Sequence, residues 1–334
     1  MLTVLLGFWR SSSMSDTPPA VLCTRRLPLE VEERLSRNYR ARLNLEDRLY
    51  DEDGMVASSE GCDAILAAGG DCLHARTIDR LPDSVRIIAT YSVGYEHIAV
   101  DRAKARGIVV THTPNVLDDA TADVAMLCLL GAARRGAEGD KMVREDAWKG
   151  WHTGLLVGVH VTGKRLGIYG MGRIGRAVAQ RARGFDMEIH YYNRRRLPSD
   201  LESGAIYHES PESMLRVSDF LSINAPSSPE TRGFLNAQSI SLLPEGAVVV
   251  NTARGDLIDD DALIDALRSG KVAAAGLDVF ANEPAIDARY RELKNTFLLP
   301  HIGSASVETR NAMGWCCLDN LDAFFAGNPC PNAL

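Results

Sequence analysis

The segment that decides the fold is Gly170-Met171-Gly172-Arg173-Ile174-Gly175, a G-x-G-x-x-G pattern between two expected elements. The apolar run 166–169 before it predicts a strand, and the run 177–182 after it predicts a helix. At such a turn the first glycine permits the tight bend, and the second lets the backbone approach a pyrophosphate. The third lets helix and strand pack closely, and the start of the helix offers N–H donors to an anion. This setting separates the pattern from an ordinary glycine turn, so we expect a dinucleotide to be bound by Gly170, Gly172, Arg173, Ile174 and Gly175.

A second strand is expected at 187–192, and the residues after it indicate which dinucleotide binds. NAD sites place an acidic residue roughly 20 residues beyond the glycines, where it bonds the ribose 2′-hydroxyl. This chain instead reads Asn193-Arg194-Arg195-Arg196. Guanidinium groups bind a 2′-phosphate through charge-assisted bonds, whereas a carboxylate would repel it. We therefore expect Asn193, Arg194 and Arg195 to bind NADP(H) in preference to NAD(H); the alternative interpretation is an exposed basic turn.

The composition excludes several classes of protein. The 334 residues are enough for two domains with substantial cores. A net charge of −7 argues against a general nucleic-acid partner. No apolar run approaches the roughly 20 residues that a membrane helix needs. Seven cysteines without a regular framework are typical of reduced thiols, so we expect a cytoplasmic protein.

Residues 1–18 are expected to be a disordered lead. The stretch 1–9 is apolar, but it lacks the basic start and the small-residue cleavage site of a signal peptide. A stretch rich in serine and proline follows it. Two alternatives stay open for this region: a cleaved signal, and translation that starts at Met14.

The rest of the chain alternates predicted strands and helices. Short apolar runs predict a first series of strands at 20–23, 64–67, 85–89 and 108–111. A second series is expected at 165–169, 187–192, 219–223, 247–251 and 274–278. Two such series imply two doubly wound α/β domains with parallel sheets.

A predicted helix at 308–325 complicates a simple division into two halves. It follows the last strand of the second series and could cross back to the first domain. The domains would then be 19–113 with 304–334, and an insertion at 114–303. Ligand sites favour such domain interfaces.

Side chains suited to catalysis follow successive strand ends of the second series. Arg254 comes after the strand 247–251, Glu283 comes after the next strand, and His301 lies in a loop of small residues. Open α/β sheets bind ligands at the carboxyl ends of their strands. Each residue also has an ordinary interpretation, since an arginine can bond a loop carbonyl, a glutamate can cap a turn, and a single histidine is often structural. Their occurrence at successive strand ends favours a shared site.

These three side chains suit the reduction of a 2-keto acid. A guanidinium binds a planar carboxylate and polarises the neighbouring carbonyl. A protonated histidine neutralises the charge that hydride transfer builds on the carbonyl oxygen, typically worth about 10²–10⁴-fold in rate. Glu283 would favour the imidazolium and orient its ring, and neutral His301 would take the hydroxyl proton in the reverse direction. No metal is expected, because the histidines and cysteines show no cluster at zinc-site spacing.

The chain resembles the D-isomer-specific 2-hydroxyacid dehydrogenase family from about residue 20 onward. The segments that carry the resemblance are 170–175, 251–255, 276–284 and 300–304, in this order. The resemblance implies an α/β fold of two doubly wound parallel-sheet domains. One would be a flavodoxin-like substrate domain and the other a Rossmann cofactor domain, with an active-site cleft between them.

The same resemblance implies roles for individual residues. The implied catalytic residues are Arg254, Glu283 and His301, of which the first and last would also bind substrate. Thr252 and Asp278 would bind the cofactor, with Asp278 near the nicotinamide carboxamide. Ser92-Val93-Gly94-Tyr95 is similar to a loop whose backbone N–H groups hold the substrate carboxylate, which makes Val93 and Gly94 substrate-binding residues.

Within the family the chain is most similar to NADPH-preferring glyoxylate/hydroxypyruvate reductases. The segments 116–123, 193–195 and 301–305 carry this closer likeness. It implies NADPH-dependent reduction of glyoxylate or hydroxypyruvate to the corresponding D-2-hydroxy acid.

The family is usually homodimeric through its cofactor domain. Trp148-Lys149-Gly150-Trp151 lies where relatives place an aromatic residue near the dimer contact. For Trp148 and Trp151 we expect packing in the core or interface rather than a reach into the partner's active site.

Departures from the family pattern leave the substrate pocket open. Tyr95-Glu96-His97 and His152-Thr153 replace more usual residues of relatives. The alternatives are a 2-ketogluconate reductase, a dehydrogenase of another D-2-hydroxy acid, and a nucleotide-sensing corepressor of the same fold. Corepressors of that type favour NAD(H), so Arg194 and Arg195 argue against the last.

Overall fold

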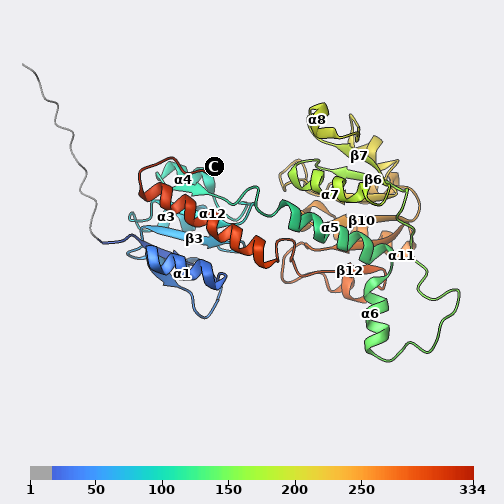
Figure 1. The fold of residues 1–334 in the computed structure, drawn as a ribbon, viewed down its shortest axis with the longest axis horizontal. Helices are drawn as coiled ribbons and strands as arrows, with labels where there is room; N and C mark the ends of the chain where they lie inside the picture. The colour runs from blue at the N-terminus through green and yellow to red at the C-terminus, as the bar shows by residue number, and fades with distance from the viewer. Residues whose placement is uncertain (1–16) are drawn as a thin grey trace, which may run out of the picture. The chain divides into compact units, whose positions relative to one another are not determined.

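The structure is a computed structural model that describes residues 17–334. The lead expected at 1–18 lies outside the described residues apart from its last two positions. The described chain forms two compact units (Figure 1). Unit 1 comprises the residues up to Pro114 together with Asn311–Leu334, and unit 2 comprises Asn115–Arg310. The assignment of residues 19–113 and 304–334 to substrate binding, and of residues 114–303 to cofactor binding, stays a prediction. The compactness of a unit does not show which ligand it binds.

Unit 1 is built on a five-stranded parallel sheet in the order β2-β1-β3-β4-β5. Its strands are β1 (Ala20–Cys23), β2 (Arg40–Leu43), β3 (Ala64–Ala68), β4 (Ile87–Tyr91) and β5 (Val109–Thr111). This is the flavodoxin-like order. Strands β1 and β4 are buried throughout, as apolar strands of a parallel sheet are, whereas edge strand β2 alternates exposed and half-buried positions.

The helices of unit 1 come from both ends of the described chain. They are α1 (Leu29–Asn38), α2 (Glu52–Ser59), α3 (Ala75–Arg80), α4 (Val100–Ala105) and the part of α12 (Val307–Phe325) from residue 311 on. Met313, Cys317 and Leu321 of α12 are buried. The return of this helix to the first set of strands is therefore part of the fold, as its sequence predicts.

Unit 2 is built on a seven-stranded parallel sheet in the order β12-β11-β10-β9-β6-β7-β8. Its strands are β6 (Arg165–Tyr169), β7 (Glu188–Tyr192), β8 (Ile206–Tyr207), β9 (Phe220–Ile223), β10 (Ala247–Asn251), β11 (Val272–Leu277) and β12 (Thr296–Leu298). This is the Rossmann order with one added strand, and the order reverses between β6 and β9. Ligands bind open α/β sheets outside the carboxyl ends of the strands at this point.

Helices and two short 3₁₀ segments complete unit 2. They are α5 (Asp118–Ala133), α6 (Gly136–Arg144), α7 (Arg173–Arg183), α8 (Ser199–Glu202), α9 (Pro211–Leu215), α10 (Ala237–Leu242), α11 (Asp260–Ser269), η1 (Gly255–Leu257) and η2 (Ala288–Glu292). Helix α5 packs against α7 and against β10 and β11, while α6 projects from the body of the unit (Figure 1).

The predicted fold class of two parallel-sheet α/β domains is confirmed. Strands β2, β8 and β12 were not expected, because each is short and lies at a sheet edge. The strand expected at 85–89 begins at Ile87 instead, since Val85 closes a turn by donating its N–H to the Pro82 carbonyl at 3.0 Å.

Candidate active site

The glycine turn between β6 and α7 has the geometry that its sequence predicts. Gly170 has a φ of +95°, and a Cβ there would lie 2.6 Å from the Ala225 nitrogen. A Cβ on Gly175 would lie 2.3 Å from the Gly170 carbonyl oxygen, so helix and turn touch directly. By contrast, a Cβ on Gly172 would meet nothing within 4 Å. Packing therefore requires the outer glycines, and the middle one leaves open space above the turn.

The start of α7 completes this cradle. Gly172 caps the helix without a side-chain hydrogen bond, so the first N–H groups have no side-chain acceptor. The Arg173 side chain turns to α5, where its Nε donates to Asp118 Oδ2 at 3.1 Å. The turn and the helix start thus provide the backbone donors and open space that a pyrophosphate needs.

The polar residues that follow β7 divide into two groups. Asn193 accepts a hydrogen bond from the Met171 N–H at 2.7 Å, so it holds the glycine turn. Arg196 is bound by the buried Glu202, with Nε to Oε1 at 2.8 Å and Nη2 to Oε2 at 3.0 Å. Two exposed side chains make no ion pair within the described residues: Arg194 and Arg195. Arg196 is therefore a structural residue, and its two neighbours present their charge to solvent.

Two buried oxygen atoms without partners follow the neighbouring strands β9 and β10. Thr252 Oγ1 follows β10, Asn224 Oδ1 follows β9, and neither has a hydrogen-bond partner among the described residues. Unpaired buried polar atoms are costly, so these atoms indicate where polar groups of a ligand would bind. Thr252 was predicted as a cofactor residue. Asn224 was missed, although its position at the end of the strand beside β6 could have indicated it.

The loop after β10 presents Arg254. The buried Asn251 clamps this loop, since its Nδ2 donates to the Arg254 carbonyl at 2.8 Å and its Oδ1 accepts from the Ala253 N–H at 3.0 Å. Arg254 Nη1 donates to the Ala253 carbonyl at 2.7 Å. A Cβ on Gly255 would lie 1.8 Å from the Phe280 carbonyl carbon. This close approach brings the Arg254 loop against the loop that follows β11.

That second loop carries Glu283, which is paired with His301. His301 Nδ1 lies 2.7 Å from Glu283 Oε2, and Glu283 Oε1 accepts the Phe280 N–H at 2.7 Å. Burial alone would raise the pKa of Glu283, but these hydrogen bonds outweigh burial and lower it. The nearby Arg254 charge acts in the same direction. Glu283 is therefore an ionised acceptor, which makes the facing Nδ1 a donor.

The His301 loop is anchored by Asp278, directly after β11. Its Oδ1 accepts the Ile302 N–H at 2.7 Å, and its Oδ2 accepts the Gly303 N–H at 2.8 Å. Burial raises the pKa of Asp278, although these two bonds oppose the rise. His301 itself has a φ of +55°, which is uncommon for a residue with a Cβ. The two bonds hold this conformation and direct the imidazole, whose side chain is 51 % exposed, toward Glu283.

Val93 and Gly94 lie in unit 1, in the loop after β4. The N–H groups of Val93 and Gly94 have no acceptor among the described residues, and both residues are half-buried. The loop therefore offers two adjacent backbone donors.

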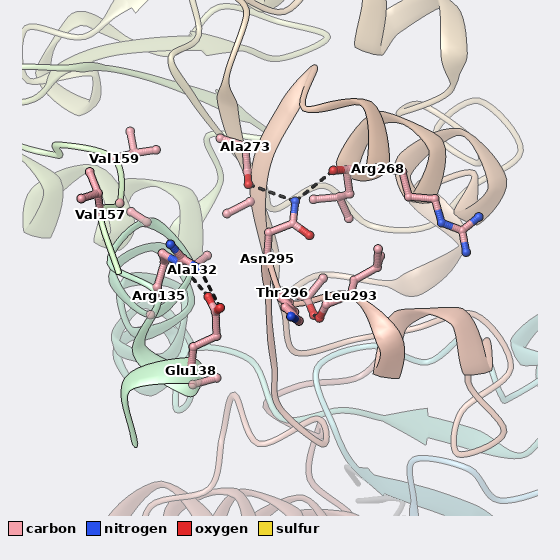
Figure 2. A pocket seen from close by; sticks show the side chains of 17 residues that line it. Ala132, Arg135, Glu138, Val157, Val159, Arg268, Ala273, Leu293, Asn295 and Thr296 are labelled. Atoms are coloured by element: carbon pink, nitrogen blue, oxygen red, sulfur yellow. Dashed lines mark hydrogen bonds and ion pairs between the residues drawn. The ribbon is translucent and has the colours of Figure 1, made fainter. Parts of the chain in front are cut away.

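A cavity of about 520 Å³ elsewhere in unit 2 is not the candidate site (Figure 2). It lies between the end of α5, the segment around Val157 and Val159, and the residues between α11 and β12. The Arg135–Glu138 ion pair and the Asn295 side chain line it (Figure 2). None of the predicted catalytic or cofactor residues does.

Among residues 17–334, no helix combines the length and the apolar character that a membrane span requires. No group of three or more histidine, cysteine or acidic side chains there could hold a metal ion.

The Rossmann sheet, the glycine cradle and the His301–Glu283 pair define an NAD(P)-dependent oxidoreductase. The family described as "D-isomer specific 2-hydroxyacid dehydrogenase, NAD binding domain" matches residues 126–303. The chain belongs to this family, as its motifs predict.

Similar proteins agree with this assignment. A glycerate dehydrogenase of Hyphomicrobium methylovorum is 46% identical over 94% of this chain and 98% of its own. A glyoxylate reductase of Thermococcus litoralis is 40% identical over 95% and 96%. The structure of an NADPH-dependent glyoxylate/hydroxypyruvate reductase from Sinorhizobium meliloti, in complex with NADP and malonate, has a TM-score of 0.86 and 34% identity, and the match covers 95% and 97% of the two chains. These names support an enzyme over the corepressor alternative.

Proposed function

We propose that this protein reduces a small 2-keto acid, glyoxylate or hydroxypyruvate, to the D-2-hydroxy acid with NADPH. The observation that carries the proposal is the 2.7 Å pair of His301 and Glu283, held against the loop of Arg254. The pair supplies an acid–base group, and Arg254 supplies a cation that can bind a carboxylate. Both follow strand ends of a dinucleotide-binding sheet.

Arg254 binds the substrate carboxylate and polarises the neighbouring keto group. A guanidinium can form two parallel hydrogen bonds to a carboxylate. The N–H groups of Val93 and Gly94, in unit 1, are further hydrogen-bond donors that we propose for substrate binding. Electrostatic stabilisation of this type acts most strongly where donors are already oriented.

His301 gives its proton to the keto oxygen during reduction and takes it back in the oxidation of the hydroxy acid. With Nδ1 held by Glu283, Nε2 is the nitrogen that faces the reacting oxygen. The ionised Glu283 stabilises the charged imidazole and orients the ring. This division of roles needs no further proton carrier.

When bound, the nicotinamide cofactor would supply a hydride to the keto carbon. The residues that would hold its pyrophosphate are those of the cradle: Gly170, Gly172, Arg173, Ile174 and Gly175. Thr252 and Asp278 would bind the nicotinamide end of the cofactor, and Asn193 would bind near the adenosine ribose. Arg194 and Arg195 bind the 2′-phosphate, because they are exposed, form no ion pair within the described chain and follow β7 where NAD sites carry an acid.

The protein also forms a homodimer through unit 2. Trp148 and Trp151 follow the projecting α6 and are 55% and 78% exposed. Exposure of two large aromatic side chains to water is unfavourable for a monomer. The cavity of Figure 2 lies in the same unit and gives the partner a concave surface to fill. Light scattering should report a dimer. Serine at Trp148 and Trp151 should weaken it, whereas serine at exposed Leu201 should not.

A reducing, cytoplasmic location is consistent with the cysteines. All seven are free of disulfides, and four are buried as small apolar residues. Reduced thiols are the rule in the cytosol.

Steady-state oxidation of NADPH and NADH with glyoxylate, hydroxypyruvate and 2-ketogluconate tests the proposal. We expect fast turnover with the two small acids and NADPH. Equal or faster turnover with 2-ketogluconate would favour the larger-substrate alternative. Preference for hydroxypyruvate, whose reduction gives glycerate, would agree with the name of the glycerate dehydrogenase relative.

A further inference from the structure

The loop between β4 and α4 is held by the segment that follows β5. The Ser92 carbonyl accepts the Thr113 N–H at 2.9 Å. The Val93 carbonyl accepts a hydrogen bond from His112 Nδ1 at 2.9 Å. Since a carbonyl can only accept, Nδ1 of His112 carries a proton in this contact. One main-chain group and one side chain therefore fix two consecutive carbonyls.

This arrangement determines where the amide N–H groups of the loop point. In a trans peptide the C=O and the following N–H point in opposite directions. The carbonyl bonded by Thr113 belongs to the same peptide as the Val93 N–H, and the carbonyl bonded by His112 belongs to the same peptide as the Gly94 N–H. Both N–H groups are thus directed away from the β5 side, and neither has an acceptor among the described residues.

His112 is itself held in place from several sides. Its N–H donates to the Asn332 carbonyl at 3.2 Å, and Cys316 Sγ lies 3.8 Å from its carbonyl oxygen. The Tyr95 ring packs edge-on against the imidazole, with ring centroids 5.8 Å apart and an interplanar angle of 83°. The imidazole is therefore already oriented toward the loop.

We propose that His112 is a positioning residue for keto-acid binding: its Nδ1–H fixes the Val93–Gly94 peptide so that the Gly94 N–H is available to the substrate carboxylate. The inference rests on the proposed reduction of a 2-keto acid and adds a residue that does not touch substrate. His112 acts through the loop, so its loss should weaken substrate binding and leave proton transfer at His301 intact.

Three substitutions at His112 distinguish the contribution of its Nδ1–H donor from that of its imidazole ring. His112→Asn keeps an N–H donor at the same number of bonds from Cβ and removes the ring. His112→Phe keeps a ring against Tyr95 and removes the donor, and His112→Leu is a smaller donor-free variant should phenylalanine prevent folding. His74→Asn, at an exposed histidine without a side-chain capping bond in the same unit, is the matched control.

The measurement is KM and kcat for glyoxylate at saturating NADPH, with NADPH affinity and melting temperature recorded for each variant. Loss of one neutral hydrogen bond corresponds to about a three- to tenfold change. We expect KM to rise by this factor in His112→Phe or His112→Leu, with kcat and NADPH affinity within twofold of the parent. His112→Asn should restore KM.

Three results would overturn the inference. The first is a parental KM in the donor-free variants. The second is an equal defect in His112→Asn and His112→Phe, and the third is a matched fall in kcat and melting temperature. Either of the last two would mean that His112 contributes only general packing.

Binding of oxamate, an unreactive analogue of a 2-keto acid, separates this failure from that of the proposed function. If Arg254→Lys weakens oxamate binding and His112→Phe does not, the function stands and the role of His112 is rejected. If the parent neither binds oxamate nor turns over a keto acid, both are rejected.

Discussion

Replacement of Glu283 by glutamine tests the acid–base pair most closely. Glutamine keeps an oxygen that can accept the Phe280 N–H but removes the negative charge that faces His301. Hydrogen bonds to charged groups contribute about 1.5–3 kcal/mol, and 1.4 kcal/mol is tenfold, so the loss corresponds to about 10- to 150-fold in kcat/KM. The Glu283 and His301 side chains are 31% and 51% exposed, so solvent screens part of this loss. We therefore expect the lower half of the range, about 10- to 40-fold.

The pH dependence gives this prediction a second readout. Reduction needs the protonated imidazole, and the carboxylate stabilises that form. With glutamine, kcat/KM for glyoxylate should therefore begin to decline at a lower pH than in the parent. The assay is NADPH absorbance between about pH 5 and pH 9, the range in which histidine-dependent rates usually change. Glu245→Gln, at an exposed surface pair with Lys271, is the control. A parental rate and pH profile in Glu283→Gln would refute the pairing as a catalytic device.

Four other variants test further parts of the account. Arg254→Lys keeps the charge but loses the planar fork, so kcat/KM should fall at least tenfold; parental kinetics would reject bidentate carboxylate binding. Alanine at both Arg194 and Arg195 should raise KM for NADPH far more than for NADH. Equal effects of this double variant on the two cofactors would remove the 2′-phosphate argument. Arg196→Ala, by contrast, should mainly lower the melting temperature. Burial would raise the pKa of Glu32, but its hydrogen bonds to an arginine and a backbone N–H outweigh burial and lower the pKa. The stability that Glu32 contributes is therefore present above about pH 5 and is lost as pH falls through its folded pKa. Urea unfolding of Glu32→Gln should accordingly show a deficit near neutrality that shrinks toward about pH 3, and a deficit independent of pH would contradict it.

Much of the fold and site can be predicted from local sequence. The 170–175 turn is recognisable because the conformation, the open approach and the close helix contact each require glycine at a fixed spacing. Apolar runs predict the central strands, because a strand that is buried on both faces of a parallel sheet needs apolar side chains on both.

The parts that could not be predicted depend on contacts that only the folded chain creates. Three adjacent arginines look alike in sequence, and only the fold pairs Arg196 with Glu202, which also accepts a hydrogen bond from Tyr191. Likewise, nothing local distinguishes His112 from other histidines, because its partner is a carbonyl 19 positions away. The role of Asp278 as an anchor for the His301 loop also arises from the return of the chain beside β11.

The central claim is transfer of hydride to the keto carbon with formation of a D-2-hydroxy acid. The most direct test supplies NADPH carrying deuterium at the transferable C4 position, together with hydroxypyruvate, and analyses the product by mass spectrometry and chiral chromatography. The account predicts D-glycerate with one deuterium at C2, formed by the parent and reduced at least a hundredfold in His301→Ala, which should still bind NADPH. L-glycerate, a product without deuterium, or a parental rate in His301→Ala would contradict it.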